Sequence, residues 1–303
     1  MFQVLLLPIF LSVLMSVEGN VTRVIYDGRA SFSMGAEDLD TSTGPFLTAV
    51  KGQNESASYY TALLGHSAFP TPLWSKFGVL PTEQVISLKI DNTSVFVPGG
   101  GPPQLGFRRT ELIAQVNESA AALDATMETG TTVFHFSIKA DLTRPLSYNH
   151  EYQIVFIEPS DGTHVFEVQL GSPFTDPTGA LPVPNAHSFK VRDHALNVLF
   201  TTPFVPLVWH NFAITVDWDS RTLMVSYSFD GLPLQAVTPT VKNPTATAGA
   251  LGDFHFGILK LPLVNPKDSP TDQSDVVHHG TQEGTTEALF YSGVFVERSA
   301  SVS

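Results

Sequence analysis

The sequence contains no cysteine, so no disulfide can stabilise the folded chain. Stability must come from a hydrophobic core, which 303 residues with 43% hydrophobic content can supply. Charged residues are also scarce, at 15% compared with about a quarter in typical soluble domains. Phenylalanine, glycine and proline are instead abundant, with 22 of each, and this combination favours short strands joined by turns.

Positive charge is the second deficit of the sequence. There are 16 Lys and Arg residues against 29 Asp and Glu, which gives a formal net charge of −13. Proteins that bind nucleic acid usually present a basic face, so we expect no nucleic-acid partner. A polyanionic sugar is disfavoured for the same reason, unless a local basic cleft overrules the global field.

Long hydrophobic runs are missing except at the N-terminus. The apolar run Val4–Met15 precedes small residues at Val17 and Gly19, so residues 1–19 are predicted to be a signal peptide, although the usual positive start is absent. No later segment could span a bilayer, so we expect no membrane partner. The predicted product is a secreted, extracellular glycoprotein, because glycosylation sequons begin at Asn20, Asn54, Asn92 and Asn117.

Alternation of apolar and polar residues predicts an all-β chain. Thr131–Ala140 alternates strongly, and Asp217–Arg221 reads as a hairpin turn between two strands. Ala120–Glu128 is the best short helix, while Asn265–Glu287 is a polar loop of unusual length that could form a lid or cleft wall. About ten to twelve strands at short spacing indicate a two-sheet sandwich or jelly roll. Residues 20–303 are predicted to be a single domain, and we expect a monomer.

Two arginines and a carboxylate stand inside the strand-like segment Phe107–Ala114. In a strand, Arg109 and Glu111 share one face, so the arginine would hold the carboxylate ionised by lowering its pKa. A solvated strand face with a local ion pair would give the same pattern. This segment is therefore a candidate site that needs a partner elsewhere in the chain.

Glu158 is the candidate partner, because it ends the apolar run Ile154–Ile157. Partial desolvation would raise its pKa and suit it to act as a general acid, with Glu111 as the ionised base or nucleophile. Glycoside hydrolysis requires two carboxyl groups with such opposed environments. Strict alternation places Glu158 on the face of Phe156, so we expect a bulge or strand end to redirect it.

Two Phe-His-Phe segments place His135 and His255 between apolar anchors. Each histidine alone could be structural, but the two together on one face would indicate a sugar-binding cleft. Lys260 could be a cleft cation or a surface lysine. The sequence shows no nucleophile elbow, phosphate-binding loop, zinc-spaced cluster or dinucleotide fingerprint, so we expect no cofactor and no metal.

A set of segments in this order resembles glycoside hydrolase family 131: Tyr26–Arg29, Ala36–Asp40, Pro45–Gly52, Phe107–Leu112, Phe134–Ser137, Glu151–Gln153, Phe254–Lys260 and Tyr291–Glu297. The resemblance implies a secreted fungal β-glucanase with a concanavalin-like β-jelly roll and an open extended cleft. The expected partner is β-glucan with β-1,3, β-1,6 or β-1,4 linkages.

The resemblance also implies roles for particular residues. It places the catalytic carboxylates at Glu111 and Glu158, and substrate-binding positions at Arg109, His135, His255 and Lys260. The chain departs from the family pattern at Ile157–Pro159, where a Phe-Glu-Ser-like context is expected.

Two other functions remain open at this stage. A polysaccharide lyase on the same fold would use a cation such as Arg109 to neutralise a uronate. A non-catalytic glucan-binding cell-wall protein would lack converging carboxylates. Of the two stereochemical outcomes of hydrolysis we favour inversion, while linkage preference, the choice between endo and exo action and the assignment of acid and base are left undetermined.

Overall fold

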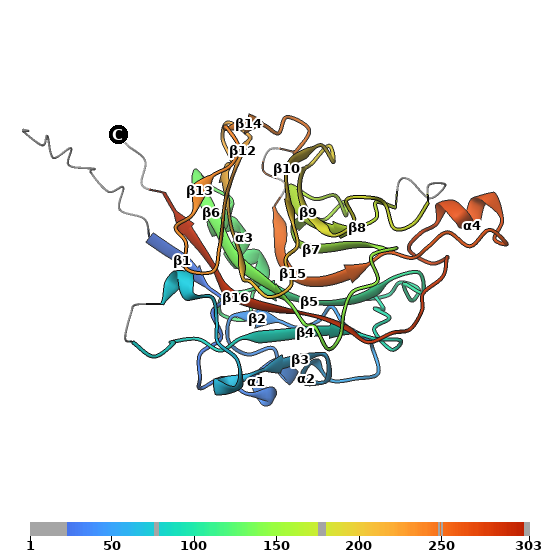
Figure 1. Ribbon diagram of the computed structural model, residues 1–303, viewed down its shortest axis with the longest axis horizontal. Helices are drawn as coiled ribbons and strands as arrows, with labels where there is room; N and C mark the ends of the chain where they lie inside the picture. The colour runs from blue at the N-terminus through green and yellow to red at the C-terminus, as the bar shows by residue number, and fades with distance from the viewer. Residues whose placement is uncertain (1–22, 76–78, 175–179, 248, 250, 300–303) are drawn as a thin grey trace, which may run out of the picture.

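The strands predicted from alternation form two antiparallel sheets, which face each other across one core (Figure 1). The computed structural model describes residues 23–75, 79–174, 180–247, 249 and 251–299. The predicted signal peptide and the sequon at Asn20 lie outside these ranges. No helix within them is both long enough and apolar enough to cross a membrane.

The first sheet has 9 strands and is built around two long neighbours, β6 and β16. In spatial order it contains β13 (Gln235–Ala236), β12 (Thr222–Phe229), β11 (His210–Asp217), β6 (Thr131–Ala140), β16 (Glu287–Arg298), β4 (Ile86–Ile90) and β3 (Thr61–Leu63), with β1 (Arg23–Asp27) also paired to β16 and β14 (Val241–Lys242) to β12. The predicted turn at Asp217–Arg221 joins β11 to β12, which pair in register along their whole length.

The second sheet has 7 strands. In spatial order it contains β10 (Val198–Pro203), β9 (Ser188–Asp193), β8 (Phe166–Gly171), β7 (Glu151–Pro159), β15 (Gly252–Lys260), β5 (Arg108–Ala114) and β2 (Phe46–Leu47). Its central strands β7, β15 and β5 come from distant parts of the chain. Their pairing brings together residues that the sequence keeps far apart.

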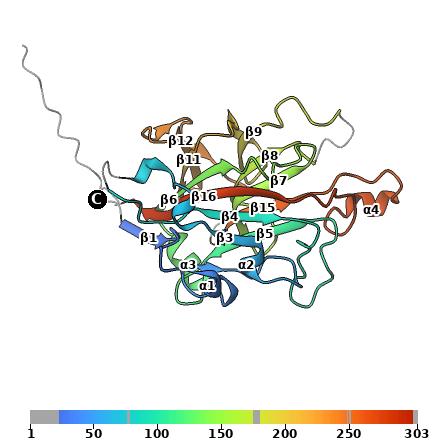
Figure 2. The ribbon, with the colours of Figure 1, turned by 60° about the horizontal axis from the view of Figure 1, so that its bottom comes forward.

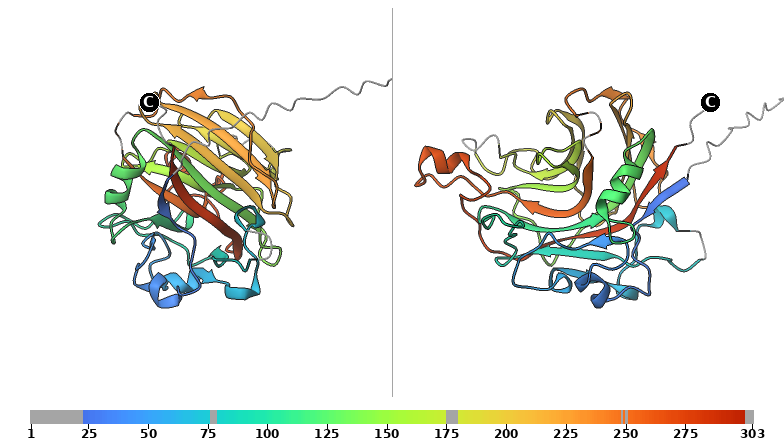
Figure 3. Two further views of the ribbon diagram at one scale, coloured as in Figure 1. Left: turned by 90° about the vertical axis from the view of Figure 1, so that its left-hand side faces the viewer. Right: turned by 180° about the vertical axis from the view of Figure 1, so that it is seen from behind.

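Short helices surround the sheets. They are α1 (Ala36–Asp40), α2 (Ala57–Tyr60), α3 (Ala120–Met127) and α4 (Pro270–Ser274), with 3₁₀ turns at Gly65–Ser67 and Pro72–Trp74. Helix α3 confirms the predicted helix, and Ser119 caps it by accepting a hydrogen bond from the Ala122 amide. Helices α1 and α2 lie beside β3, at the edge of the sandwich seen at the bottom of Figure 3. Helix α4 lies in the predicted long loop, at the end of the molecule opposite β1 (Figure 2).

Aromatic side chains fill the space between the sheets. Phe134 of β6 packs edge-on against Phe254 of β15, with ring centroids 5.0 Å apart, and Phe256 contacts Tyr291 of β16 at 5.8 Å. All four rings are buried. Because alternate residues of a strand point to opposite faces, the residues next to Phe134 on β6, and next to Phe254 and Phe256 on β15, point to the outer faces of the two sheets.

Candidate active site

Strand β5 holds an arginine–glutamate pair on the outer face of the 7-stranded sheet. The Arg109 guanidinium donates from Nε to Oε1 of Glu111 and from Nη2 to Oε2, each at 2.7 Å. Leu112, on the other face, lies in the core. The shared face therefore follows from alternation as predicted, and the paired geometry is the strong, bidentate form of a charge-assisted hydrogen bond.

His255 of β15 adds a second donor to the same carboxylate. Its Nδ1 lies 2.8 Å from Oε2 of Glu111. Gly257 stands opposite Glu111 in the register of β15 and β5. A Cβ added at Gly257 would lie 2.3 Å from the Thr110 carbonyl oxygen and 3.1 Å from Cγ of Glu111, so only glycine leaves room for this carboxylate.

These contacts decide the charge of Glu111. Burial alone would raise its pKa, but the charge of Arg109 and the hydrogen bonds from His255 and Arg109 outweigh burial and lower the pKa to about 2. The Glu111 side chain has no exposed surface. It is thus an ionised carboxylate whose two oxygens are both occupied by protein donors.

Glu158 at the end of β7 reaches the same cluster from the neighbouring strand. Its Oε2 lies 3.3 Å from Nη2 of Arg109 and 3.9 Å from Nε2 of His255. Its side chain keeps 25% of its surface exposed. Arg109 and His255 therefore each face both carboxylates, one enclosed and one open to solvent.

The expected redirection of Glu158 by a bulge or strand end was wrong. The sequence suggested that Phe156 faces the core between the sheets, but it does not. It forms a separate cluster with Leu259 and Leu261 on the outer face. Glu158 shares that face by plain alternation, while Ile157 points into the main core.

The spacing of the carboxylates also bears on metal binding. One ligand atom each from Glu111, Glu158 and His255 lie within 4.8 Å of one another, which is close enough for a shared cation. Arg109 already donates to both carboxylates, so a cation would have to compete with its guanidinium. Arg109 thus supplies the positive charge at this position.

A pocket with a volume of about 490 Å³ opens beside Glu158. The predicted long loop forms one wall through Val276 and Val277, and it is attached to the sheet where the Gly106 amide donates to the Val277 carbonyl at 2.9 Å. The polar side of the pocket contains Gln104, Arg109, Gln153, Glu158, Thr163, His164, Glu167 and His194. Apolar walls with several polar groups are typical of ligand sites.

His135 does not join this site, which corrects the expectation of one shared histidine face. Its neighbours Phe134 and Phe136 lie in the core, so His135 points to the outer face of the other sheet. There its Nε2 lies 3.2 Å from Glu297, and its ring stacks on Phe295 at 4.4 Å. The two similar Phe-His-Phe segments therefore lie in different sheets, and His135 and His255 face away from each other.

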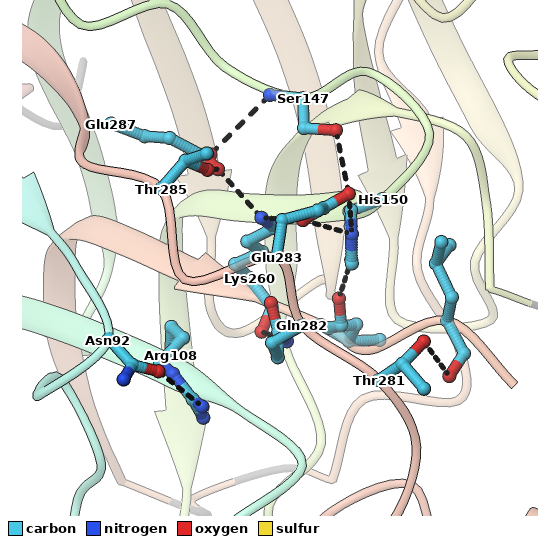
Figure 4. A network of polar contacts seen from close by, with 12 residues as sticks. Asn92, Arg108, Ser147, His150, Lys260, Thr281, Gln282, Glu283, Thr285 and Glu287 are labelled. Atoms are coloured by element: carbon cyan, nitrogen blue, oxygen red, sulfur yellow. Dashed lines mark hydrogen bonds and ion pairs between the residues drawn. The ribbon is translucent and has the colours of Figure 1, made fainter. Parts of the chain in front are cut away.

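Lys260 is also away from the pocket. It lies on the side of β15 opposite His255 and Leu259, with 2% of its surface exposed. Figure 4 shows it between two carboxylates, and its Nζ lies 2.7 Å from both Glu283 Oε2 and Glu287 Oε1. His150 contacts the other oxygen of Glu283 at 2.8 Å. Lys260 therefore anchors the end of the long loop to the sheet rather than facing a ligand in this arrangement.

Within the described residues, the glycosylation sites predicted from the sequence lie on the surface. Asn54, Asn92 and Asn117 are all exposed. Their accessibility is compatible with the prediction, and modification itself stays a prediction.

Sequence reasoning missed another charged group beside the pocket. Arg192 of β9 pairs with both Glu151 of β7 and Glu167 of β8, and Glu167 accepts a hydrogen bond from His164. The alternation of Glu167 between Phe166 and Val168 was the available signal, since it places this carboxylate on the outer face.

Comparison with known proteins identifies the family. A model described as the glycoside hydrolase 131 catalytic N-terminal domain matches residues 24–302. A GH131 β-glucanase catalytic domain from Podospora anserina has a similar structure, with a TM-score of 0.66, 23% sequence identity, and coverage of 92% of this chain and 97% of that chain. The catalytic domain of a glycoside hydrolase family 131 protein from Coprinopsis cinerea is similar, with a TM-score of 0.64, 23% identity, and coverage of 91% and 94%.

A comparison with curated proteins found no match. The structural likenesses confirm the predicted two-sheet β-jelly roll, while the open extended cleft stays a prediction. The family model spans nearly all of the described residues and is that of a catalytic domain, which suggests glycoside hydrolase activity. This chain belongs to glycoside hydrolase family 131.

Proposed function

We propose that this chain hydrolyses β-glucans of plant or fungal cell walls, with β-1,3, β-1,6 or β-1,4 linkages as substrates. The observation that carries the proposal is the pair of unlike carboxyl groups on one sheet face. Glu111 is enclosed and ionised, while Glu158 is partly exposed at a pocket. Glycoside hydrolysis uses two carboxyl groups in such different settings.

Glu158 is assigned the acid role in this mechanism. It can protonate the glycosidic oxygen because its carboxyl group lines the pocket. Glu111 is assigned the base or nucleophile role because it stays ionised. Its oxygens are occupied by Arg109 and His255, so one of these side chains must move aside before Glu111 can contact water or sugar.

The same movement bears on stereochemistry. One oxygen of Glu111 and one of Glu158 lie within 4.8 Å of each other, which is nearer to the roughly 5–5.5 Å between the carboxyl groups of retaining enzymes than to the roughly 6.5–9.5 Å of inverting ones. Inversion, which we favoured from the sequence, therefore requires the two carboxylates to separate when sugar binds. Proton NMR of the first anomer released from laminarin distinguishes inversion from retention.

Two alternatives fit the site less well. A lyase needs a cation that is free to neutralise a uronate, but Arg109 is already paired with two carboxylates. A purely binding protein needs no converging carboxylates. Absorbance from a new double bond would indicate a lyase, and tight binding of laminarin without release of reducing ends would indicate a binding protein.

The proposal is tested by a product profile on β-1,3-, β-1,4- and β-1,6-glucans. Glu158→Gln is expected to lower kcat by about 10²–10⁴-fold, the usual range for a general acid, while its unfolding temperature changes little because the side chain is partly exposed. The exposed Glu118→Gln variant is the control and should keep wild-type rates. Near-full activity of both Glu158→Gln and Glu111→Gln would disprove the assigned pair.

Secretion, N-glycosylation and a monomeric state complete the proposal. The apolar N-terminal run and the exposed Asn54, Asn92 and Asn117 support the first two. Mass spectrometry of the secreted protein, before and after enzymatic removal of N-glycans, tests both. Light scattering during size-exclusion chromatography tests the monomeric state.

A further inference from the structure

Three aromatic rings, those of Phe156, His164 and His255, stack beside Glu158. Phe156 lies between His255, at a centroid distance of 4.9 Å and an interplanar angle of 16°, and His164, at 4.2 Å and 19°. Phe156 is fully buried. It therefore holds two nearly parallel imidazoles on either side of itself, on the face that carries the carboxylates.

The two histidines have matching supports. His255 contacts Glu111 through Nδ1, and Glu111 is paired with Arg109. His164 contacts Glu167 through Nδ1 at 2.6 Å, and Glu167 is paired with Arg192. The outer face thus contains a second Arg–Glu–His set, whose glutamate and arginine are buried.

The buried glutamate selects the tautomer of a neutral His164 ring. Burial alone would raise the pKa of Glu167, but the hydrogen bond from His164 and the charge of Arg192 lower it. Since ionised Glu167 can only accept, the proton of a neutral His164 ring must lie on Nδ1. Its Nε2 then carries a lone pair and can accept a hydrogen bond.

The position of His164 gives that acceptor a use. His164 lines the same pocket as Glu158, and Phe156 and Glu167 hold its ring from two directions. His194 also lines the pocket, but its nitrogens contact the hydroxyls of Thr245 and Thr163. The hydrogen bond that the structure gives to His164 uses Nδ1.

We propose that His164 is a substrate-binding residue whose Nε2 accepts a hydrogen bond from a hydroxyl group of the glucose unit bound beside Glu158. The inference rests on the proposed glucan hydrolysis. The fixed ring gives orientation at little entropic cost, because Glu167 and Phe156 have already immobilised it. Arg192 and Glu167 act through His164 and are positioning residues.

Substitution of His164 by asparagine or by glutamine tests the roles of its two ring nitrogens separately. His164→Asn keeps an amide donor near the Nδ1 position for Glu167 but places nothing at the Nε2 position. His164→Gln places an amide near the Nε2 position. His66→Asn is the matched control, because His66 stacks on Phe32 away from the pocket.

Binding of laminarihexaose and cellohexaose is measured by calorimetry in the Glu158→Gln background, where hydrolysis does not interfere. His164→Asn is expected to raise Kd by about 5- to 10-fold, which corresponds to the loss of one neutral hydrogen bond. His164→Gln should recover most of that loss, and His66→Asn should bind as the background does. In the otherwise wild-type enzyme, His164→Asn should raise KM on laminarin by a similar factor, with kcat changed less.

Each outcome has a defined meaning. Equal binding by the background and His164→Asn would overturn the role of His164, and glucan hydrolysis by the wild type would still stand. If the wild type releases no reducing ends from any glucan, the proposed function itself is disproved. Thermal unfolding checks that the variants fold. If His164→Asn does not fold, His164→Phe replaces it, because phenylalanine keeps the stacking on Phe156 and offers no nitrogen.

Discussion

Replacing Glu111 with glutamine is expected to destabilise the protein by about 3 kcal/mol at neutral pH. The pKa of Glu111 falls from an ordinary 4.5 to about 2. A tenfold change in proton affinity corresponds to about 1.4 kcal/mol, so the folded state favours the ionised carboxylate by about 3 kcal/mol. Glutamine cannot carry that charge, and it leaves Glu158, at 3.3 Å, as the remaining carboxyl partner of the buried Arg109.

The effect should depend on pH in one direction. The folded-state pKa of Glu111 lies below its ordinary value, so its contribution is complete above about pH 4.5 and is lost as the pH falls towards 2. Linkage gives a remaining contribution of about 1.4 kcal/mol at pH 3. The difference in unfolding free energy between wild type and Glu111→Gln should therefore shrink by more than half between pH 7 and pH 3.

Urea unfolding, followed by tryptophan fluorescence at pH 7, 5, 4 and 3, measures this difference. The double variant Arg109→Met/Glu111→Leu is the control, because replacing both partners of the buried pair with apolar residues leaves no buried charge of that pair uncompensated, and Glu158 is partly exposed. It should be more stable than Glu111→Gln. A difference below about 1 kcal/mol at pH 7, or one that stays constant down to pH 3, would refute the argument that ionised Glu111 holds Arg109 in place.

Two further predictions concern buried charges outside the pocket. Lys260→Met should lower the unfolding free energy by about 3–5 kcal/mol, because it leaves the buried carboxylate of Glu287 without its cation, whereas exposed Lys267→Met should stay within about 0.5 kcal/mol of the wild type. Equal urea midpoints for the two variants would contradict the anchoring role of Lys260. Burial raises the pKa of Glu128 to about 8. The unfolding free energy of the wild type should therefore fall as the pH rises from about 4.5 to 8, because the buried carboxyl group resists ionisation. Glu128→Gln should therefore gain stability relative to the wild type by about 3.5 kcal/mol between pH 5 and pH 8, and calorimetric scans at both pH values would expose a shift of the opposite sign.

Local patterns in the sequence determined much of the fold and part of the site. Alternation placed Arg109 and Glu111 on one face, and it identified Phe134 and Phe136 as core residues. The helix at α3 was predicted from its composition, and in the structure Ser119 caps its start. These predictions succeeded because the direction of a side chain in a strand, and the capping of a helix, depend on residues close in sequence.

Only the tertiary structure decided which outer-facing residues meet. The segments around His135 and His255 look alike, yet β6 and β15 belong to different sheets, and strand order depends on packing between residues far apart in the chain. His164, Glu167 and Arg192 come together because β8 pairs with β9. The sequence by itself thus determined which residues of a strand share a face, while the order of the strands decided what lies beside them, because pairing is a long-range interaction that alternation does not encode.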